Sequence, residues 1–220
     1  MFSISRRTWR DAVSVALTVG AYGVAFGAAG VAAGFSVVQT GLFSLLAFTG
    51  ASQFAAVGVV AAGGAGLSAV VAASLLSVRN ALYSLQMAPR LEARGWRRFL
   101  AAHLTIDEST NVALAQSPLG PSAVRHGFWL TGSGVFIFWN LFTLLGAVGA
   151  KALGDPAAWG LDAAVPAAFL GLLWPRLRDR RVRVIAGVAV IFSLVTTPLL
   201  PAGTPIIATV LVAVVAGWRA

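Results

Sequence analysis

The sequence contains one long apolar run in which no residue is charged. It extends from Ala12 to Val78, and a helix needs only about 20 apolar residues to cross the hydrocarbon core of a bilayer. Two further uncharged stretches, 126–150 and 184–218, also reach this length. Only 10% of the 220 residues are charged, whereas soluble domains have about a quarter. The chain is therefore predicted to be all-α: one membrane domain over residues 1–220, a polytopic bundle of about six to seven transmembrane helices.

The composition and the motifs exclude several classes of function. The chain has no cysteine, and its two histidines, His103 and His126, are too few for an imidazole metal site. A P-loop, a Gly-x-Ser-x-Gly elbow and a His-Glu-x-x-His zinc motif are also missing from the sequence. We therefore expect that the protein is not an enzyme and that it uses no cofactor or metal.

The net charge of +9 comes from arginines at the ends of the apolar runs. Positive residues at such places mark the cytoplasmic loops of membrane proteins, so we expect a bilayer and no nucleic acid around this chain. The first nine residues are too short and too polar for a cleaved signal peptide, so the first helix is expected to stay in the mature chain, with a cytoplasmic N-terminus. The arginine groups are Arg6, Arg7 and Arg10; Arg90, Arg94, Arg97 and Arg98; Arg176, Arg178, Arg180, Arg181 and Arg183; and Arg219.

If all these groups are cytoplasmic, the chain must cross the membrane an even number of times between one group and the next. The stretch 126–150 then leaves the cytoplasm and 156–175 returns to it. The last stretch, 184–218, must cross twice, with a turn at "PLLPAGTP". By the same parity, residues 12–78 must cross an even number of times.

However, the run 12–78 divides into three segments, at "AAGFS" (32–36) and at "AAGGAG" (61–66). One segment must therefore enter the membrane without crossing it. The middle segment, 37–62, is the candidate because Gly50-Ala51-Ser52-Gln53 divides it into two halves, each long enough for about half a bilayer. We predict a broken or re-entrant helix there. The alternative is that 37–62 crosses in full and 99–118 crosses back, with Asp107 and Glu108 inside the hydrocarbon.

Polar residues within this apolar run are candidates for substrate binding. Ser52 and Gln53 adjoin the predicted break, where they either bond neighbouring helices or contact a substrate. Arg79 and Asn80 come before "ALYSLQM", so Arg79 is set back from the end of its apolar segment. Such an arginine either pairs with an acid or presents its fork to a substrate carboxylate.

Three acids are candidates for coupling or gating. Asp107 and Glu108 follow Thr105 in "LTIDEST", a pattern typical of a helix start with Thr105 as N-cap and Glu108 in a capping box. Acids beside an apolar stretch are equally candidates for a proton relay. Asp162 precedes Pro166 by four residues, and the proline would loosen the helix at that acid.

Glycines recur at helix-packing spacing in "GAYGVAFGAAGVAAG". The pairs Gly23-xxx-Gly27 and Gly30-xxx-Gly34 predict small-residue seams along which helices approach closely.

Five motifs in this order resemble the AzlC-type family of bacterial branched-chain amino acid exporters. They are "AYGVAFG", "FTGASQFAAV", "SVRNALYSLQMAP", "LTIDEST" and "WGLDAAVPAAFLGLL", and the resemblance covers residues 11 to 215. The chain departs from the family pattern at "SVRN".

The resemblance implies secondary-active export of leucine, isoleucine, valine and possibly methionine. It also implies that this chain is the large subunit, working with a small AzlD-like membrane protein. Two alternatives stay open from the residues themselves: a channel through the broken segment, and an assembly subunit of a membrane complex without a substrate site of its own.

Overall fold

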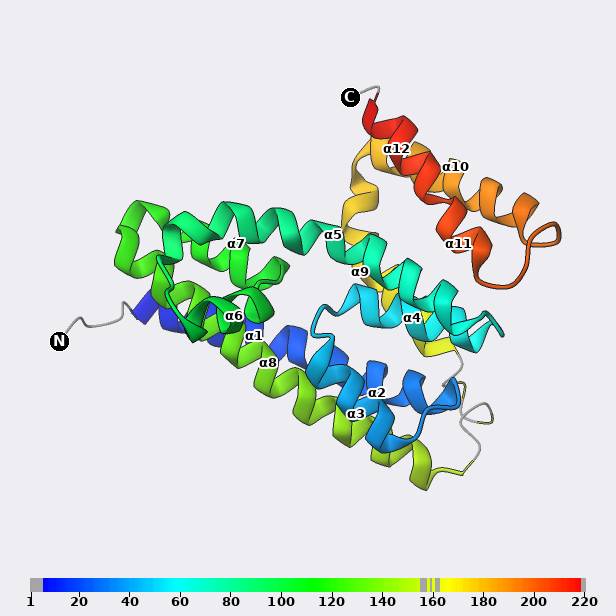
Figure 1. Cartoon of the computed structure of the whole chain (residues 1–220), viewed down its shortest axis with the longest axis horizontal. Coiled ribbons are helices and arrows are strands. Elements are labelled where there is room, and N and C mark those ends of the chain that lie inside the picture. Colours follow the sequence, from blue (N-terminus) through cyan, green and yellow to red (C-terminus); the bar gives the residue numbers. More distant parts are fainter. Residues whose placement is uncertain (1–5, 155–157, 159, 161–162, 219–220) are drawn as a thin grey trace.

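A computed structural model describes residues 6–154, 158, 160 and 163–218, and all regular elements in these residues are helices (Figure 1). The predicted all-α membrane bundle is thus confirmed. The elements are α1 (Arg6–Gly20), α2 (Tyr22–Ala32), α3 (Val37–Leu46), α4 (Ala51–Ala61), α5 (Gly66–Leu91), α6 (Trp96–Leu104), α7 (Asp107–Ala115), η1 (Ser117–Leu119), α8 (Pro121–Ala152), α9 (Ala164–Leu173), η4 (Trp174–Arg178), α10 (Arg180–Thr196), α11 (Thr204–Ala208) and α12 (Val210–Trp218).

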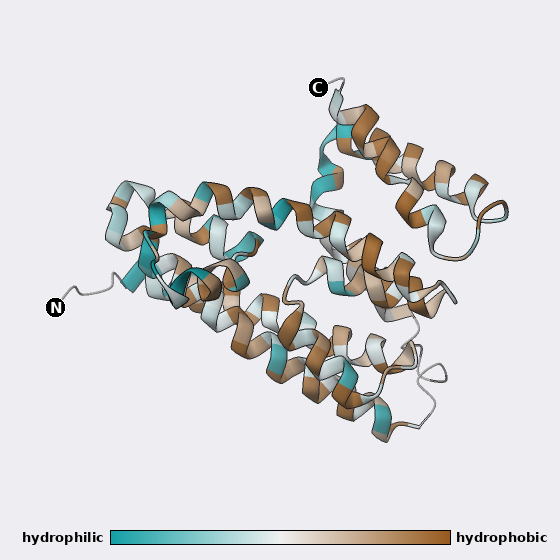
Figure 2. Cartoon of the chain, in the orientation of Figure 1, coloured by the Kyte–Doolittle hydropathy of each residue, from teal (hydrophilic) through white to brown (hydrophobic). Residues whose placement is uncertain are grey.

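Among the described residues, three helical segments are long and apolar enough to cross a membrane: Arg6–Ala32, which joins α1 and α2, then α5 and α8. The first and the last of these run parallel, because Ala16 packs on Gly134 and Gly27 packs farther along on Thr143. Helix α5 runs in the opposite direction. Hydrophilic residues gather around the start of α1 and around α6 (Figure 2), and we call this side of the molecule the arginine end.

A seam of glycines joins α2 to α8. A Cβ atom at Gly23 would lie 2.5 Å from the carbonyl oxygen of Trp139, and one at Gly27 would overlap the carbonyl oxygen of Thr143. The first predicted seam is therefore confirmed, and its partner is α8. The second seam is only half formed: Gly30 packs on Thr40 of α3, whereas Gly34 is a turn residue with φ +94°.

Helices α3 and α4 form a re-entrant hairpin, which we call hairpin 1. The Gln53 amide donates to the carbonyl oxygens of Phe43 and Ser44, at 3.3 and 3.4 Å. These bonds require α4 to fold back along α3, because a continuing helix would carry residue 53 about 15 Å beyond residue 43. The chain turns at Gly50, whose φ of +58° and ψ of −90° only glycine adopts readily. The prediction of a re-entrant segment at 37–62 is confirmed.

Helices α6 and α7 form a second re-entrant hairpin, hairpin 2, which enters from the arginine end. Leu104, at the end of α6, and Ser109, in α7, both pack on Gly132 near the middle of α8. The chain then returns, since Gln116 packs on Gly127 close to the start of α8. The alternative in which 37–62 and 99–118 both cross is therefore wrong, because neither segment crosses.

Thr105 is also not the N-cap that the sequence suggested. Its hydroxyl donates back to the carbonyl oxygen of Ala101, at 2.7 Å, so it ends α6 instead of starting α7. Ile106 occupies the cap position, and its N–H donates to the Ser109 hydroxyl at 3.1 Å. The turn between the half-helices thus consists of Thr105 and Ile106.

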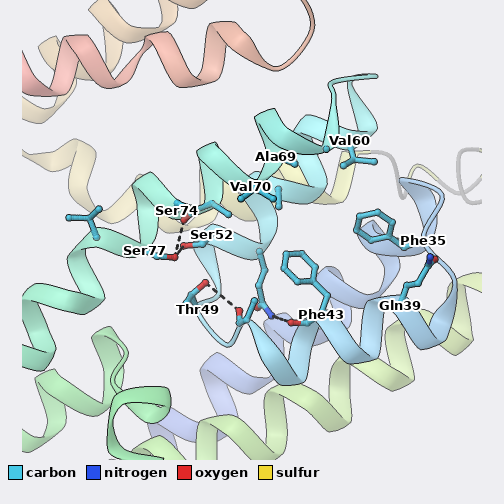
Figure 3. Close-up of a pocket in the computed structure, with 16 residues that line it drawn as sticks. Phe35, Gln39, Phe43, Thr49, Ser52, Val60, Ala69, Val70, Ser74 and Ser77 are labelled. Atoms are coloured by element: carbon cyan, nitrogen blue, oxygen red, sulfur yellow. Dashed lines mark hydrogen bonds between the residues drawn. The ribbon is translucent and has the colours of Figure 1, made fainter. Parts of the chain in front are cut away.

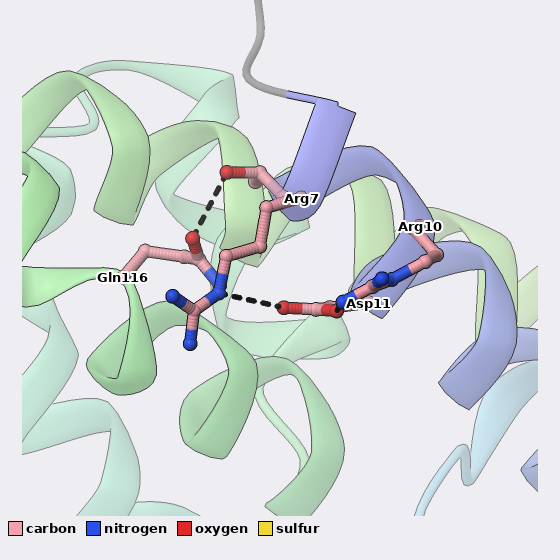
Figure 4. Close-up of polar contacts among 5 residues, drawn as sticks. Arg7, Arg10, Asp11 and Gln116 are labelled. Atoms are coloured by element: carbon pink, nitrogen blue, oxygen red, sulfur yellow. Dashed lines mark hydrogen bonds and ion pairs between the residues drawn. The ribbon is translucent and has the colours of Figure 1, made fainter.

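The start of α1 is held against the end of hairpin 2. The Thr8 hydroxyl donates to the side-chain oxygen of Gln116 in a buried bond of 2.9 Å (Figure 4). Beside it, Arg7 and Arg10 both form exposed ion pairs with Asp11, at 3.8 and 3.4 Å. This contact anchors the charged end of α1 beside the point where α7 leaves the bundle.

The C-terminal helices α10 to α12 form an antiparallel pair of helical arms. The chain turns between residues 197 and 203, as the sequence predicted, and Gly203 packs on Val59 at the far end of α4. The start of α10 and the end of α12 lie close together (Figure 1), and Arg181 donates to the carbonyl oxygen of Ala216 at 3.0 Å. Among the described residues of α10 and α12 none is buried.

The glycine seam can be tested with two neighbouring positions on α8. A Cβ at Gly146 would overlap the carbonyl oxygen of Val24, whereas one at Gly149 meets no atom within 4 Å. Forcing a methyl group into a tight contact costs about 1–3 kcal/mol. We expect Gly146→Ala to lower the unfolding temperature of the purified protein in detergent. Gly149→Ala is the matched control and is expected to leave that temperature unchanged or slightly raised. Equal effects at both positions would contradict the seam.

Candidate functional site

The tips of the two hairpins meet beside the middle of α8. Phe48, at the tip of hairpin 1, lies with its ring centroid 6.0 Å from that of His103 in hairpin 2. Both rings pack on Phe136 of α8, at 5.1 and 5.5 Å. Two breaks that are more than 50 residues apart in the chain therefore come together at one point.

A cavity of about 360 Å³ opens at this point, and we call it the central cavity. Its volume lies in the range of small-molecule sites, which is roughly 300–1,000 Å³. Both tips contribute to its wall, together with α1, α2, α5, α8, α9 and η4. The lining residues are Val19, Tyr22, Phe48, Thr49, Gly50, Ala51, Phe54, Arg79, Ile106, Asp107, Glu108, Val135, Trp139, Phe169, Leu173 and Arg176.

One ion pair crosses the wall of the central cavity. Arg79 of α5 donates to the carboxylate of Asp107, at the start of α7, over 2.8 Å. The two side chains are 36% and 19% exposed. The Nε atom of Arg79 is buried and has no hydrogen-bond partner in the residues that the structure describes. The sequence left open whether Arg79 pairs with an acid or presents its guanidinium to a substrate carboxylate. In the structure Arg79 pairs with Asp107 and also lines the central cavity.

The acids of hairpin 2 occupy the first turn of α7. Carboxylates are favoured there because the unpaired N–H groups give a helix start a partial positive charge. Asp107 is held by Arg79, whereas Glu108 has no salt-bridge partner among the described residues. Both acids line the central cavity, so hairpin 2 presents two carboxylates to it.

The remaining wall of the central cavity is aromatic and apolar. The ring of Phe54 lies 6.3 Å from Trp139 and 6.1 Å from Phe169, centroid to centroid, in both cases edge to face. Phe26 stacks on Trp139 at 6.0 Å and also lies 5.6 Å from Phe54, edge to face. Neither Trp139 nor Phe169 was predicted as a site residue, because each lies in an apolar stretch that is typical of a spanning helix.

Ser52 and Gln53 lie on the other side of the hairpin 1 tip and do not line the central cavity. Ser52 accepts a 3.0 Å hydrogen bond from the hydroxyl of Ser77 in α5. Gln53 is fully buried, and its amide nitrogen caps the carbonyl end of α3. This bond gives Gln53 the helix-bonding role that the sequence left open, although its side-chain oxygen is buried without a partner.

Two other predicted residues, Asn80 and Asp162, are not among the described lining residues of the central cavity. Asn80 follows Arg79 on α5 but does not line the central cavity, and its side-chain oxygen is buried with no hydrogen-bond partner among the described residues. Asp162, the third predicted coupling acid, lies outside the residues that the structure describes. The role of each therefore stays a prediction.

The sequence model of the AzlC protein family matches residues 14–153. The chain belongs to the AzlC protein family. The matched region contains both hairpins, α5 and α8, and thus all the central-cavity residues except those of α9 and η4. The resemblance noted from the five motifs is confirmed.

A relative from Helicobacter pylori (strain ATCC 700392 / 26695) is described as an uncharacterized membrane protein. It is 26% identical over 131 residues, which make up 55% of this chain and 58% of the relative. The match therefore spans less than two thirds of that protein's length. No solved structure matches the chain.

The ion pair can be tested by its effect on stability. Asp107→Asn leaves the Arg79 guanidinium unpaired beside an apolar wall, and a lost hydrogen bond to a charged group costs about 1.5–3 kcal/mol. We expect a lower unfolding temperature for Asp107→Asn and partial recovery in the double variant Arg79→Gln/Asp107→Asn. Asp11→Asn is the control, because exposed pairs contribute only about 0–1 kcal/mol. No recovery in the double variant would argue against the pair.

Proposed function

We propose that this AzlC family protein is a secondary-active exporter of branched-chain amino acids across the bacterial cytoplasmic membrane. The observation that supports this most strongly is the composition of the central cavity, which combines charges of both signs with an aromatic wall. Such a lining complements a zwitterion that carries an aliphatic side chain. The arginine end is proposed to face the cytoplasm, in agreement with the positive-inside rule.

The Arg79–Asp107 ion pair suggests how a zwitterion is bound. The substrate carboxylate would take the place of Asp107 on the guanidinium, whose planar fork can donate to both carboxylate oxygens. The freed Asp107, with Glu108 beside it, would then receive the substrate ammonium group. Phe48, Phe54 and the indole of Trp139 would hold the side chain of leucine, isoleucine, valine or methionine.

The same acids are proposed to couple export to the proton gradient. Ionisable residues within a membrane domain are costly and are commonly retained for proton relay. Glu108 supports this role because it lines the central cavity and, within the described part of the chain, forms no salt bridge. Asp162 is proposed as a further coupling or gating acid on the basis of its motif. Ser52 and Gln53 are proposed as later contacts of the substrate on its way out, and Asn80 is proposed as a substrate contact on the basis of its motif.

A small AzlD-like membrane subunit is proposed as the partner, with this chain as the large subunit. The proposal rests on membership of the AzlC family. The exposed apolar faces of α5, α10 and α12 leave ample helix surface for such a subunit and for lipid.

Transport in proteoliposomes tests the function as a whole. Labelled leucine, isoleucine, valine and methionine are offered to this chain alone and together with its small partner, with and without an imposed pH gradient. We expect saturable movement that needs both the gradient and the partner. Flux that does not saturate would favour a channel instead. No movement by folded protein under any of these conditions would leave an assembly role.

The role of Arg79 can be tested separately with a substrate that lacks the carboxylate. The wild-type protein is expected to transport leucine at least tenfold better than leucine amide, because only the acid pairs with the guanidinium. Arg79→Gln is expected to lower leucine transport and to abolish this preference. Arg90→Gln, at the end of the same helix and remote from the cavity, is the control. A preference that survives in Arg79→Gln would contradict the assignment.

A further inference from the structure

A second and larger cavity, of about 850 Å³, lies between α3, α4 and α5 (Figure 3). We call it the α3–α5 cavity. Phe35 and Val60 line it near the outer ends of hairpin 1, and Thr49 and Ser77 line it near the tip. It therefore runs along the half of the bundle opposite the arginine end, down to the level of the central cavity. Its wall is mainly apolar, with a few hydroxyl and amide groups near the tip.

Hairpin 1 and α5 both contribute to the walls of the two cavities, which meet at the tip of hairpin 1. Thr49 lines both of them, while Gly50 and Ala51 face the central cavity and Ser52 and Gln53 face the α3–α5 cavity. Here the two cavities are separated by only one turn of the backbone, residues 49–53. A displacement of this turn would join the cavities into one path through the bundle.

One side-chain hydrogen bond holds the tip against α5. The Ser77 hydroxyl donates to Ser52 over 3.0 Å, and in the described part of the chain no other side-chain hydrogen bond joins hairpin 1 to α5. The hydroxyl of Ser77 has an alternative acceptor at 2.9 Å, the carbonyl oxygen of Ala73 in its own helix. The contact between the helices can therefore open without leaving Ser77 unsatisfied.

A buried acceptor stands beside this contact. Among the described residues the side-chain oxygen of Gln53 has no hydrogen-bond partner and is buried, although Gln53 itself lines the α3–α5 cavity. A buried polar atom without a partner is costly, so it points to a group that is bound in another state. An ammonium group that passes the tip would find this acceptor next, with apolar surface beyond it for an aliphatic side chain.

We propose that the α3–α5 cavity is the exit half of the transport path and that the tip of hairpin 1 is its gate. The Ser52–Ser77 hydrogen bond holds the gate closed, and the Gln53 side-chain oxygen receives the amino group of the departing amino acid. This inference rests on the proposed export function for its direction. The gate itself is a property of the two cavities and is tested without transport as well.

Cross-linking tests the gate directly, because the chain has no cysteine of its own. The two hydroxyl oxygens are 3.0 Å apart, so sulfur atoms at these places come within bonding range after a small side-chain rotation. Oxidised Ser52→Cys/Ser77→Cys is expected to transport leucine at least tenfold more slowly than the same protein after reduction. Oxidised Ser44→Cys/Thr143→Cys, which joins α3 to α8 across 3.3 Å, is expected to match its reduced form. Undiminished transport by verified, fully cross-linked Ser52→Cys/Ser77→Cys overturns the gate.

A labelling experiment separates the gate from the export function. Val19→Cys places a thiol in the central cavity, on a helix that does not belong to the gate. A membrane-impermeant maleimide is added on the side opposite the arginine end. Ser77→Ala is expected to speed its reaction with residue 19 at least threefold. Ser74→Ala, which also lines the α3–α5 cavity but does not bond to Ser52, is expected to leave the rate unchanged.

The two outcomes are independent. Equal labelling rates for the Ser77→Ala and Ser74→Ala variants overturn the gate whether or not amino acids are transported. If labelling behaves as expected and no amino acid moves in proteoliposomes, the gate stands and the export function fails.

Discussion

Every peptide group in the hydrocarbon core must have its hydrogen bond within the protein, and both hairpins break this pattern at mid-depth. Side chains repair each break. Gln53 donates to the carbonyl end of α3, and the Ser109 hydroxyl donates to the carbonyl of Leu104 at 2.7 Å while it accepts from the N–H of Ile106. Without these bonds neither turn is stable away from water, and the cavity between the turns depends on both.

Helix α8 is the support against which both tips are placed. Its glycines allow backbone contact on two sides: Gly146 meets α2, and Gly132 meets hairpin 2. The hairpins enter from opposite ends of the bundle. Their tips meet at the level of Phe136 in α8, where Phe48 and His103 pack together. Helix α5 runs past both tips, and Arg79 is set back from its end by about three turns, which puts the guanidinium beside Asp107 rather than in the headgroup region.

The first hairpin could be predicted from sequence and the second could not, for a physical reason. Hairpin 1 breaks at Gly50, and glycine readily adopts unusual backbone angles. In addition, the cytoplasmic arginines on both sides of residues 12–78 required an even number of crossings, so one of the three segments could not cross. Hairpin 2 turns at Thr105 and Ile106, which are ordinary residues, and the acids after them look like a capped helix at the membrane surface. The central cavity was beyond reach, because no local spacing links Arg79 to an acid 28 positions away.

The two hairpins differ in charge, and this difference separates their proposed roles. The turn of hairpin 1 and the first turn of α4 have no charged residue, so this tip can move through an apolar environment without carrying an ion with it. The tip of hairpin 2 carries Asp107 and Glu108, of which one is tied to α5 by a salt bridge. Moving that tip would separate a charge pair in a medium of low dielectric constant, which is costly unless a substrate or a proton compensates. Hairpin 1 is therefore suited to the proposed gating, because its tip can move without a compensating charge. Hairpin 2 is suited to the proposed coupling, because its movement requires a substrate or a proton.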